Sequence, residues 1–338
     1  MSEKSNITFK DNYFEEKKKE MRKKADEFMG IILSLITQFV WTINSICLKF
    51  FLNKYENIFQ NKTYLFPRGL STILISLILG RIQDGKIHSI FDFNSTLFKC
   101  ILAKANLSFF AMCFWTVAVS YLRITTCQVI SSLSPILIIT FSVFLLKEQF
   151  HSRYILGIIC GIVGSVIIIL DEKKIKENEK ENKDATMQEY VIGVISIILN
   201  IVLQSFNNIT NKYMAPKVSI YTQMFYLGIF HCCYSFLWML FTWDFNYTLE
   251  YFFMSALQSV LFFLGNIFYN LSLSKISMSK YSIIQYSKFV MAFILGYSVL
   301  KEEILMNDML GTTIIGGFMV YNVMFPIQKN LKKKDCRK

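Results

Sequence analysis

The chain has 338 residues, of which 53% are hydrophobic and 18% charged, and it contains 32 Phe but only 4 Pro. A soluble domain of this length could not hide so much apolar surface, which excludes an ordinary water-soluble fold. The net charge of +12 does not indicate nucleic-acid binding, because the basic residues gather in loops and tails beside apolar segments. We therefore expect the lipid bilayer as a partner and no nucleic acid.

Long apolar segments follow one another along the chain. A bilayer core of about 30 Å is crossed by a helix of about 20 apolar residues. The predicted spans are 29–52, 64–81, 98–120, 124–146, 153–170, 190–212, 220–243, 250–273, 279–300 and 307–327. The short alternating segments of a membrane barrel do not occur among them. The predicted fold class is an all-α membrane protein with ten transmembrane helices, arranged as two five-helix repeats.

Charged segments divide this series into parts. The predicted parts are a basic cytoplasmic tail at 1–28, a first repeat at 29–170, a charged linker at 171–189, a second repeat at 190–327 and a basic cytoplasmic tail at 328–338. An even number of spans places both termini on one side, and their lysines indicate the cytoplasm. The sequence leaves open whether the membrane is the plasma membrane or a Golgi or ER endomembrane. It also leaves homodimer formation open.

The two halves contain a matching segment. TFSVFLLKEQFHSRYILG (140–157) aligns without a gap with ILGYSVLKEEILMNDMLG (294–311). Each copy has the end of a span, a Lys-Glu pair, and Leu-Gly opening the next span, which indicates an internal duplication. Because each half has an odd number of spans, the second half enters the membrane from the opposite side. Such inverted repeats are typical of secondary transporters, whose site lies near the bilayer midplane between the halves.

With this repeat, the segments FPRGL (66–70), SSLSPILIITFSVFLLKE (131–148) and GIICGIVGSVIII (157–169) resemble the drug/metabolite transporter superfamily. The most similar branch is the EamA-like one, near solute carrier family 35, and the resemblance covers about residues 30–327. It implies a carrier of nucleotide sugars, phosphorylated sugars, amino acids or other metabolites. The second half departs from the pattern, because Phe289 stands where Pro135 stands in the first half and Lys288 precedes it. The substrate is therefore open.

Polar residues recur at helical spacing in four spans that correspond between the halves. They are Thr37, Trp41, Asn44, Ser45 and Lys49 in span one; Gln128, Ser131, Ser132 and Pro135 in span four; Asn200, Gln204, Asn207, Asn208 and Asn211 in span six; and Tyr281, Gln285 and Lys288 in span nine. One interpretation is hydrogen bonding across helix interfaces. Four related stripes favour a polar central cavity. The candidate substrate-binding residues are Lys288, Gln285, Tyr281, Gln128, Ser131, Asn44, Gln204, Asn207, Asn208 and Arg68.

Lys288 is the most informative of these residues. A charge near the bilayer centre costs about 2.5 to 3.5 kcal/mol on insertion scales, so it needs a partner. A buried acid, backbone carbonyls, or a cavity with an anionic substrate could supply one, and the spans contain almost no Asp or Glu. We favour the cavity. Arg68 and Lys104 are weaker candidates that could simply lie at an interface.

Enzyme signatures are lacking in the sequence. His88, His151 and His231 lie in different loops and spans, which gives no metal site, and no phosphate-binding Gly-Lys-Ser/Thr loop occurs. We expect no cofactor and no enzymatic activity. The predicted function is secondary transport of a small metabolite by alternating access, with an anion such as a nucleotide sugar or sugar phosphate favoured. The alternatives are a carrier of neutral or cationic solutes such as amino acids or drugs, and a non-transporting receptor or scaffold.

Overall fold

The computed structural model describes most of the chain. The described residues are 2–54, 64–84, 95–131, 133–147, 183–242, 248–300 and 306–324, with short pieces at 155–156, 159–160, 162–164 and 166–167. All regular secondary structure in these ranges is helical, as the sequence predicts.

The helices follow the predicted spans closely. The first half contains α1 (Ser2–Lys54), α3 (Leu65–Asp84), α4 (Ser95–Tyr121), α5 (Ile124–Ser131) and α6 (Ser134–Leu145). The second half contains α8 (Lys183–Met214), α9 (Ile220–Thr242), α10 (Leu249–Lys275), α11 (Met278–Ile284), α12 (Ser287–Leu300) and α13 (Met306–Met324). Six helices in the described residues are long and apolar enough to cross a membrane: α1, α3, α4, α8, α9 and α10. They coincide with six predicted spans.

The total of ten spans stays a prediction. Two shorter apolar helices, Ser134–Leu145 and Val290–Val299, fall within predicted spans four and nine. Helix α13 overlaps the tenth predicted span. The fifth, 153–170, lies mostly outside the described residues.

Spans four and nine are each interrupted near the middle, where the sequence predicted continuous helices. At the first interruption the Leu133 amide donates to the Ile130 carbonyl at 3.1 Å, three residues back instead of four. Pro135, which has no amide hydrogen, lies in the first turn of the next segment and explains this break. At the second, the Lys288 amide donates to the Gln285 carbonyl at 3.1 Å without a proline. The two interruptions fall at equivalent points of the repeat.

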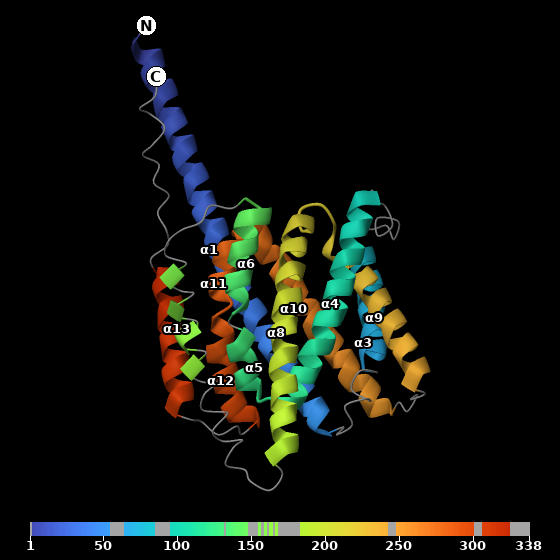
Figure 1. The fold of residues 1–338 in the computed structure, drawn as a ribbon. Coiled ribbons are helices and arrows are strands. Elements are labelled where there is room, and N and C mark those ends of the chain that lie inside the picture. The colour runs from blue at the N-terminus through green and yellow to red at the C-terminus, as the bar shows by residue number, and fades with distance from the viewer. Residues whose placement is uncertain are drawn as a thin grey trace.

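Two predicted boundaries lie inside continuous helices. Helix α1 runs from the basic N-terminal segment into the first span without a break, and it projects beyond the other helices (Figure 1). Helix α8 begins at Lys183, within the predicted linker. Lysine and glutamate are good helix formers, so charged sequence ended the apolar pattern in both places without ending the helix.

The main helix contacts join the two halves. Helix α1 packs on α10, α3 on α9, and α4 on α8, while α5 and α6 pack on α12 and α11. Under the predicted repeat, α1 corresponds to α8 and α4 to α10. The α1–α10 and α4–α8 contacts are therefore one interaction made twice, as expected for an inverted repeat.

Helices α3 and α9 approach most closely at a pair of glycines. A Cβ atom on Gly69 would lie 2.8 Å from the Gly228 carbonyl oxygen, and one on Gly228 would lie 2.9 Å from the Gly69 carbonyl oxygen. The absence of side chains at both positions lets the two backbones touch. This contact fixes the neighbouring Arg68 and His231 relative to each other.

Repeat-related lysines bind the carbonyl ends of two other helices. The Lys49 ammonium donates to the carbonyls of Val119 (2.5 Å) and Leu122 (3.0 Å) at the end of α4. In the second half Lys212 donates to the Leu273 and Ile276 carbonyls at the end of α10. A cation at these carbonyls satisfies acceptors that a helix end leaves unpaired.

Candidate functional site

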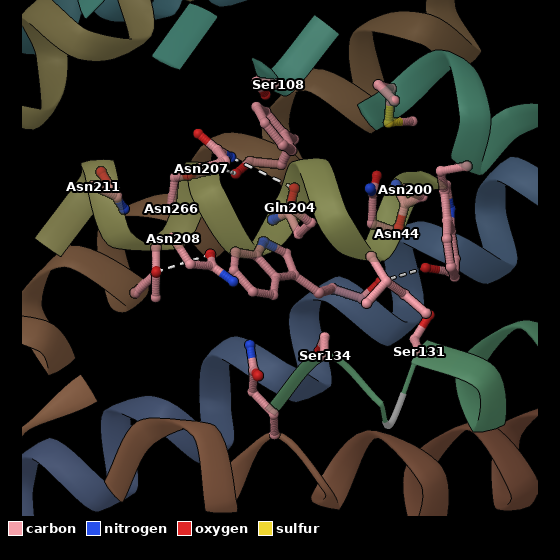
Figure 2. A pocket seen from close by; sticks show the side chains of 18 of the residues that line it. Asn44, Ser108, Ser131, Ser134, Asn200, Gln204, Asn207, Asn208, Asn211 and Asn266 are labelled. Carbon is pink, nitrogen blue, oxygen red and sulfur yellow. Dashed lines mark hydrogen bonds between the residues drawn. The ribbon is translucent and has the colours of Figure 1, made fainter. Parts of the chain in front are cut away.

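A cavity of about 140 Å³ lies among helices of both halves (Figure 2). Its lining comes from α1, α3, α4, α5, α6, α8, α9, α10 and α12 and from Gln285 between α11 and α12, and most of the lining side chains are polar. Arg68, Lys104 and Lys288 line it, whereas none of its described lining residues is Asp or Glu. The cavity is therefore polar and cationic.

The structure brings together all but one of the predicted site residues. The lining includes Lys288, Gln285, Gln128, Ser131, Asn44, Gln204, Asn207, Asn208 and Arg68. Tyr281 does not line it. Its hydroxyl accepts a hydrogen bond from Gln38 Nε2 at 2.8 Å, and its ring packs 4.8 Å from that of Tyr269. Tyr281 thus lies behind the cavity wall. Helical spacing predicts which face of a helix a side chain is on, but not whether the side chain reaches the cavity.

The amide stripe of α8 has two roles. Figure 2 shows Asn200, Gln204, Asn207, Asn208 and Asn211 along one face of the helix. Asn200 Nδ2 donates to the Ala111 carbonyl at 2.6 Å, and the Asn208 side-chain oxygen accepts from the Tyr269 hydroxyl at 2.9 Å. These two amides hold α8 to α4 and α10 while they also line the cavity. The same stripe therefore both bonds helices together and forms the cavity wall.

The partner of Lys288 is an aromatic ring. Its half-buried ammonium lies 4.8 Å from the ring centroid of Trp41, a distance suited to a cation–π interaction. A Cβ atom on Gly265 would lie 2.5 Å from Trp41 Cδ1, so the glycine makes room for the indole. Trp41 also packs 5.3 Å from Tyr269. Pairing of Lys288 with a buried acid is not observed among the described residues.

Lys104 lies in the cavity wall, although the sequence marked it only as a weak candidate. Its buried ammonium donates to the side-chain oxygens of Asn211 (2.6 Å) and Gln223 (2.5 Å). Two amide oxygens solvate the charge without neutralising it.

Arg68 lies in the cavity wall and not at a membrane interface, which was the alternative for this candidate. It is 0% exposed and lines the cavity. Its guanidinium carbon lies 4.3 Å from the ring centroid of Phe262. Arg68 therefore contributes a charge from α3 to the cavity lining.

Several lining residues on α4 and α10 were not among the predicted site residues, because no polar stripe was predicted on these helices. Lys104, Ser108 and Trp115 share one face of α4, and Phe262, Asn266 and Tyr269 share one face of α10. Both sets have the three- and four-residue spacing of neighbours on a helix. A pattern of helical spacing like that of α8 therefore marks them in the sequence. His231 of α9 also lines the cavity and had no stripe to indicate it.

A metal site is not evident in the part of the chain that the structure describes. No group of three or more His, Cys, Asp or Glu side chains comes together there. The chemistry of the cavity is instead that of cations, amides, hydroxyls and aromatic rings.

These features define a multi-pass helical membrane protein with a polar cavity between two repeated halves. The chain belongs to the EamA-like transporter family, whose pattern matches residues 28–170 and 191–323, one match in each predicted repeat. Membership makes it a transporter of small solutes and places it in the drug/metabolite transporter superfamily, in a family that is not enzymatic. The narrower resemblance to solute carrier family 35 stays a prediction.

A solved structure entitled "Crystal structure of protein" has a similar fold. The similarity covers 87% of this chain and 98% of that one, with 13% sequence identity and a TM-score of 0.62. No curated protein matches the sequence.

Proposed function

We propose that this protein carries a small anionic metabolite across the membrane by alternating access. The observation that supports this most is the charge of the cavity, where Arg68, Lys104 and Lys288 meet no acid in the described lining. Buried cations are costly unless something compensates their charge. An anionic substrate would supply that compensation while it is bound.

The same electrostatics argue against the alternative of a cationic substrate. A unit positive charge about 5 Å from one of these cations would be repelled by about 3 kcal/mol at an effective dielectric constant of 20. A neutral substrate avoids the repulsion and could use the amides of α8, but it leaves the cations uncompensated. The charge of the site therefore favours the anion.

The size of the cavity favours a small anion over a large one. Its volume is about 140 Å³, close to that of an engineered cavity of about 150 Å³ that holds benzene. A small organic acid or sugar phosphate fits this scale better than a nucleotide sugar, which would need a wider state of the cavity. We therefore expect short anionic metabolites to be the better substrates.

The interrupted helices supply a way to open the cavity on either side. Short segments with three-residue hydrogen bonds inside helices often mark hinges. The interruptions after Ser131 and Ile284 both lie next to lining residues, Ser134 and Gln285. Bending at these points would move the ends of α5, α6, α11 and α12 while the paired long helices stay together. A rocking motion of this kind is the expected transport step.

Uptake by purified protein in liposomes tests the proposal. The panel contains short organic acids, sugar phosphates, nucleotide sugars, neutral amino acids and organic cations, with protein-free liposomes as the control. We expect the short anions to be taken up or exchanged. Uptake of neutral or cationic solutes alone would favour the alternative carrier. A correctly folded protein that moves no member of the panel would favour a receptor or scaffold.

A further inference from the structure

Arg68 is a buried cation, and the residues that the structure describes use little of its hydrogen-bonding capacity. Nε, Nη1 and Nη2 are all buried, and none forms a hydrogen bond with a residue that the structure describes. The face of the guanidinium packs on Phe262. The Tyr64 hydroxyl lies near enough to interact weakly with the guanidinium, and it also pairs with Thr116 at 3.2 Å. Arginine stays protonated under all ordinary conditions and presents five donors in a planar fork.

Lys104 shows that this chain can supply partners for a buried cation. It is also almost fully buried in the same cavity, yet two amide oxygens accept from its ammonium. None of the described residues accepts a well-formed hydrogen bond from Arg68, although all three of its side-chain nitrogens are buried. Leaving donors of a buried charge unpaired is costly. A ligand that brings acceptors would remove this cost.

A second unpaired atom lies on the neighbouring helix. His231 Nε2 is buried without a hydrogen-bond partner in the described part of the chain, and its side chain lies close enough to Arg68 to interact electrostatically. Both residues line the cavity. This end of the cavity therefore offers several polar atoms to one bound group.

Arg68 of α3 and Lys288 of α12 lie next to different parts of α10. Arg68 packs on Phe262, and Lys288 packs on Trp41, which contacts Tyr269. Phe262 and Tyr269 are two turns apart on one face of α10, about 10 Å along the helix axis. The aromatic contacts of the two cations are thus much further apart than the two oxygens of one carboxylate, which points to a separate binding point at each cation.

We propose that Arg68 is a second anion-binding point and that the substrate is a small dianion with one acidic group at each end. One group binds the Arg68 fork and the other lies near Lys288, with the cavity between them holding a short carbon chain. This inference rests on the proposed function, because it assigns the substrate class of the same cavity. It makes Arg68 the residue that separates dianions from monoanions.

The test uses purified full-length protein in liposomes and a series of competitors. Linear dicarboxylates of increasing length, from malonate to adipate, are compared with monocarboxylates of equal carbon number, and 3-phosphoglycerate tests a phosphate at one end. In the wild type we expect one length of dicarboxylate to compete at least tenfold better than its monocarboxylate. If no dicarboxylate competed better than its monocarboxylate at any length, the wild-type result alone would overturn the inference.

Variants then assign the preference to a residue. Arg68→Gln is expected to reduce competition by the best dicarboxylate at least tenfold and to change that by its monocarboxylate less than threefold. Arg68→Lys keeps the charge but not the fork, so we expect an intermediate preference, and this variant decides the matter if Arg68→Gln does not fold. An unchanged ratio in either folded variant would overturn the inference.

The outcomes separate this inference from the proposed function. If monocarboxylates compete and their binding depends on Lys288, but Arg68 variants keep the wild-type ratio, only the dianion inference fails. If no anion of the series competes or is transported, both fail.

Discussion

At the scale of single residues, three cations in one cavity are held in three different ways. Lys104 donates to two amide oxygens and Lys288 lies over an indole ring. Arg68 packs on a phenyl ring, and its nitrogens form no hydrogen bond with the residues that the structure describes. Residue type alone could not distinguish these cases. The difference predicts that Lys104 contributes mainly to stability and that Arg68 and Lys288 contribute mainly to binding.

Replacement of Lys104 by methionine tests the structural role. The change leaves two buried amide oxygens without their donor, each of which costs about 1 to 3 kcal/mol. We expect the melting temperature of the detergent-purified protein to fall by about 5 °C or more. Lys99→Met on the same helix, where the lysine is exposed, is the matched control. Equal melting temperatures for the two variants would show that the hydrogen bonds of Lys104 add no net stability.

Gly265→Ala tests how the Trp41 indole is positioned. The added Cβ atom would overlap the indole ring, and the ring would have to move away from Lys288. We expect weaker binding of the transported anion, by about threefold to tenfold, because the ring and the ammonium would no longer be aligned. Unchanged affinity together with unchanged tryptophan fluorescence would contradict this role of the glycine.

At the scale of helices, the apolar length of a span is easier to predict from sequence than its interruptions and its close contacts. The sequence predicted the six long spans well because their apolar runs exceed what the bilayer requires. It did not predict the interruption near Gln285, where no proline occurs. It also did not predict that α1 and α8 extend into charged sequence, because hydropathy detects lipid contact and not helix continuity.

The glycine contact between α3 and α9 gives a prediction at this scale. Gly69→Ala or Gly228→Ala would place a methyl group against the backbone of the facing helix, and separating two helices loses contacts along both. We expect each variant to lower the melting temperature by several degrees and to reduce the yield of folded protein. Gly317→Ala, which meets nothing within 4 Å, should be neutral. If all three variants behaved alike, the close contact would not be important for stability.

At the scale of the whole molecule, the two halves are joined by helix pairs that follow the repeat. The duplication was visible in sequence through one matching segment, but the pairing of α1 with α10 and of α4 with α8 was not, because it depends on contacts between distant residues. Most of the predicted site residues meet in the cavity, because polar residues at helical spacing share one face of a helix and that face is turned to the cavity. The contributions of α4 and α10 became evident only from the packing.

Ion pairs on either side of the apolar part of α1 predict the topology. Asp26 pairs with Lys275 at 2.5 Å, and Lys54 pairs with Glu250. Residues 26 and 54 are about 42 Å apart in a continuous helix, which exceeds a bilayer core of about 30 Å. Single cysteines at 54 and 275 in a cysteine-free background should therefore label from opposite sides, with 275 cytoplasmic. Labelling of both from one side would contradict the proposed orientation.

The central claim is that the cavity binds an anion through its cations, and transport by Lys288 variants tests it most directly. Uptake of the best anion from the panel should be measured for the wild type, Lys288→Gln, Lys288→Arg and the exposed control Lys99→Gln, all at equal amounts of folded protein. We predict that Lys288→Gln loses at least tenfold in uptake, that Lys288→Arg keeps most of it, and that Lys99→Gln behaves as the wild type. Unchanged affinity and rate in Lys288→Gln would contradict the account.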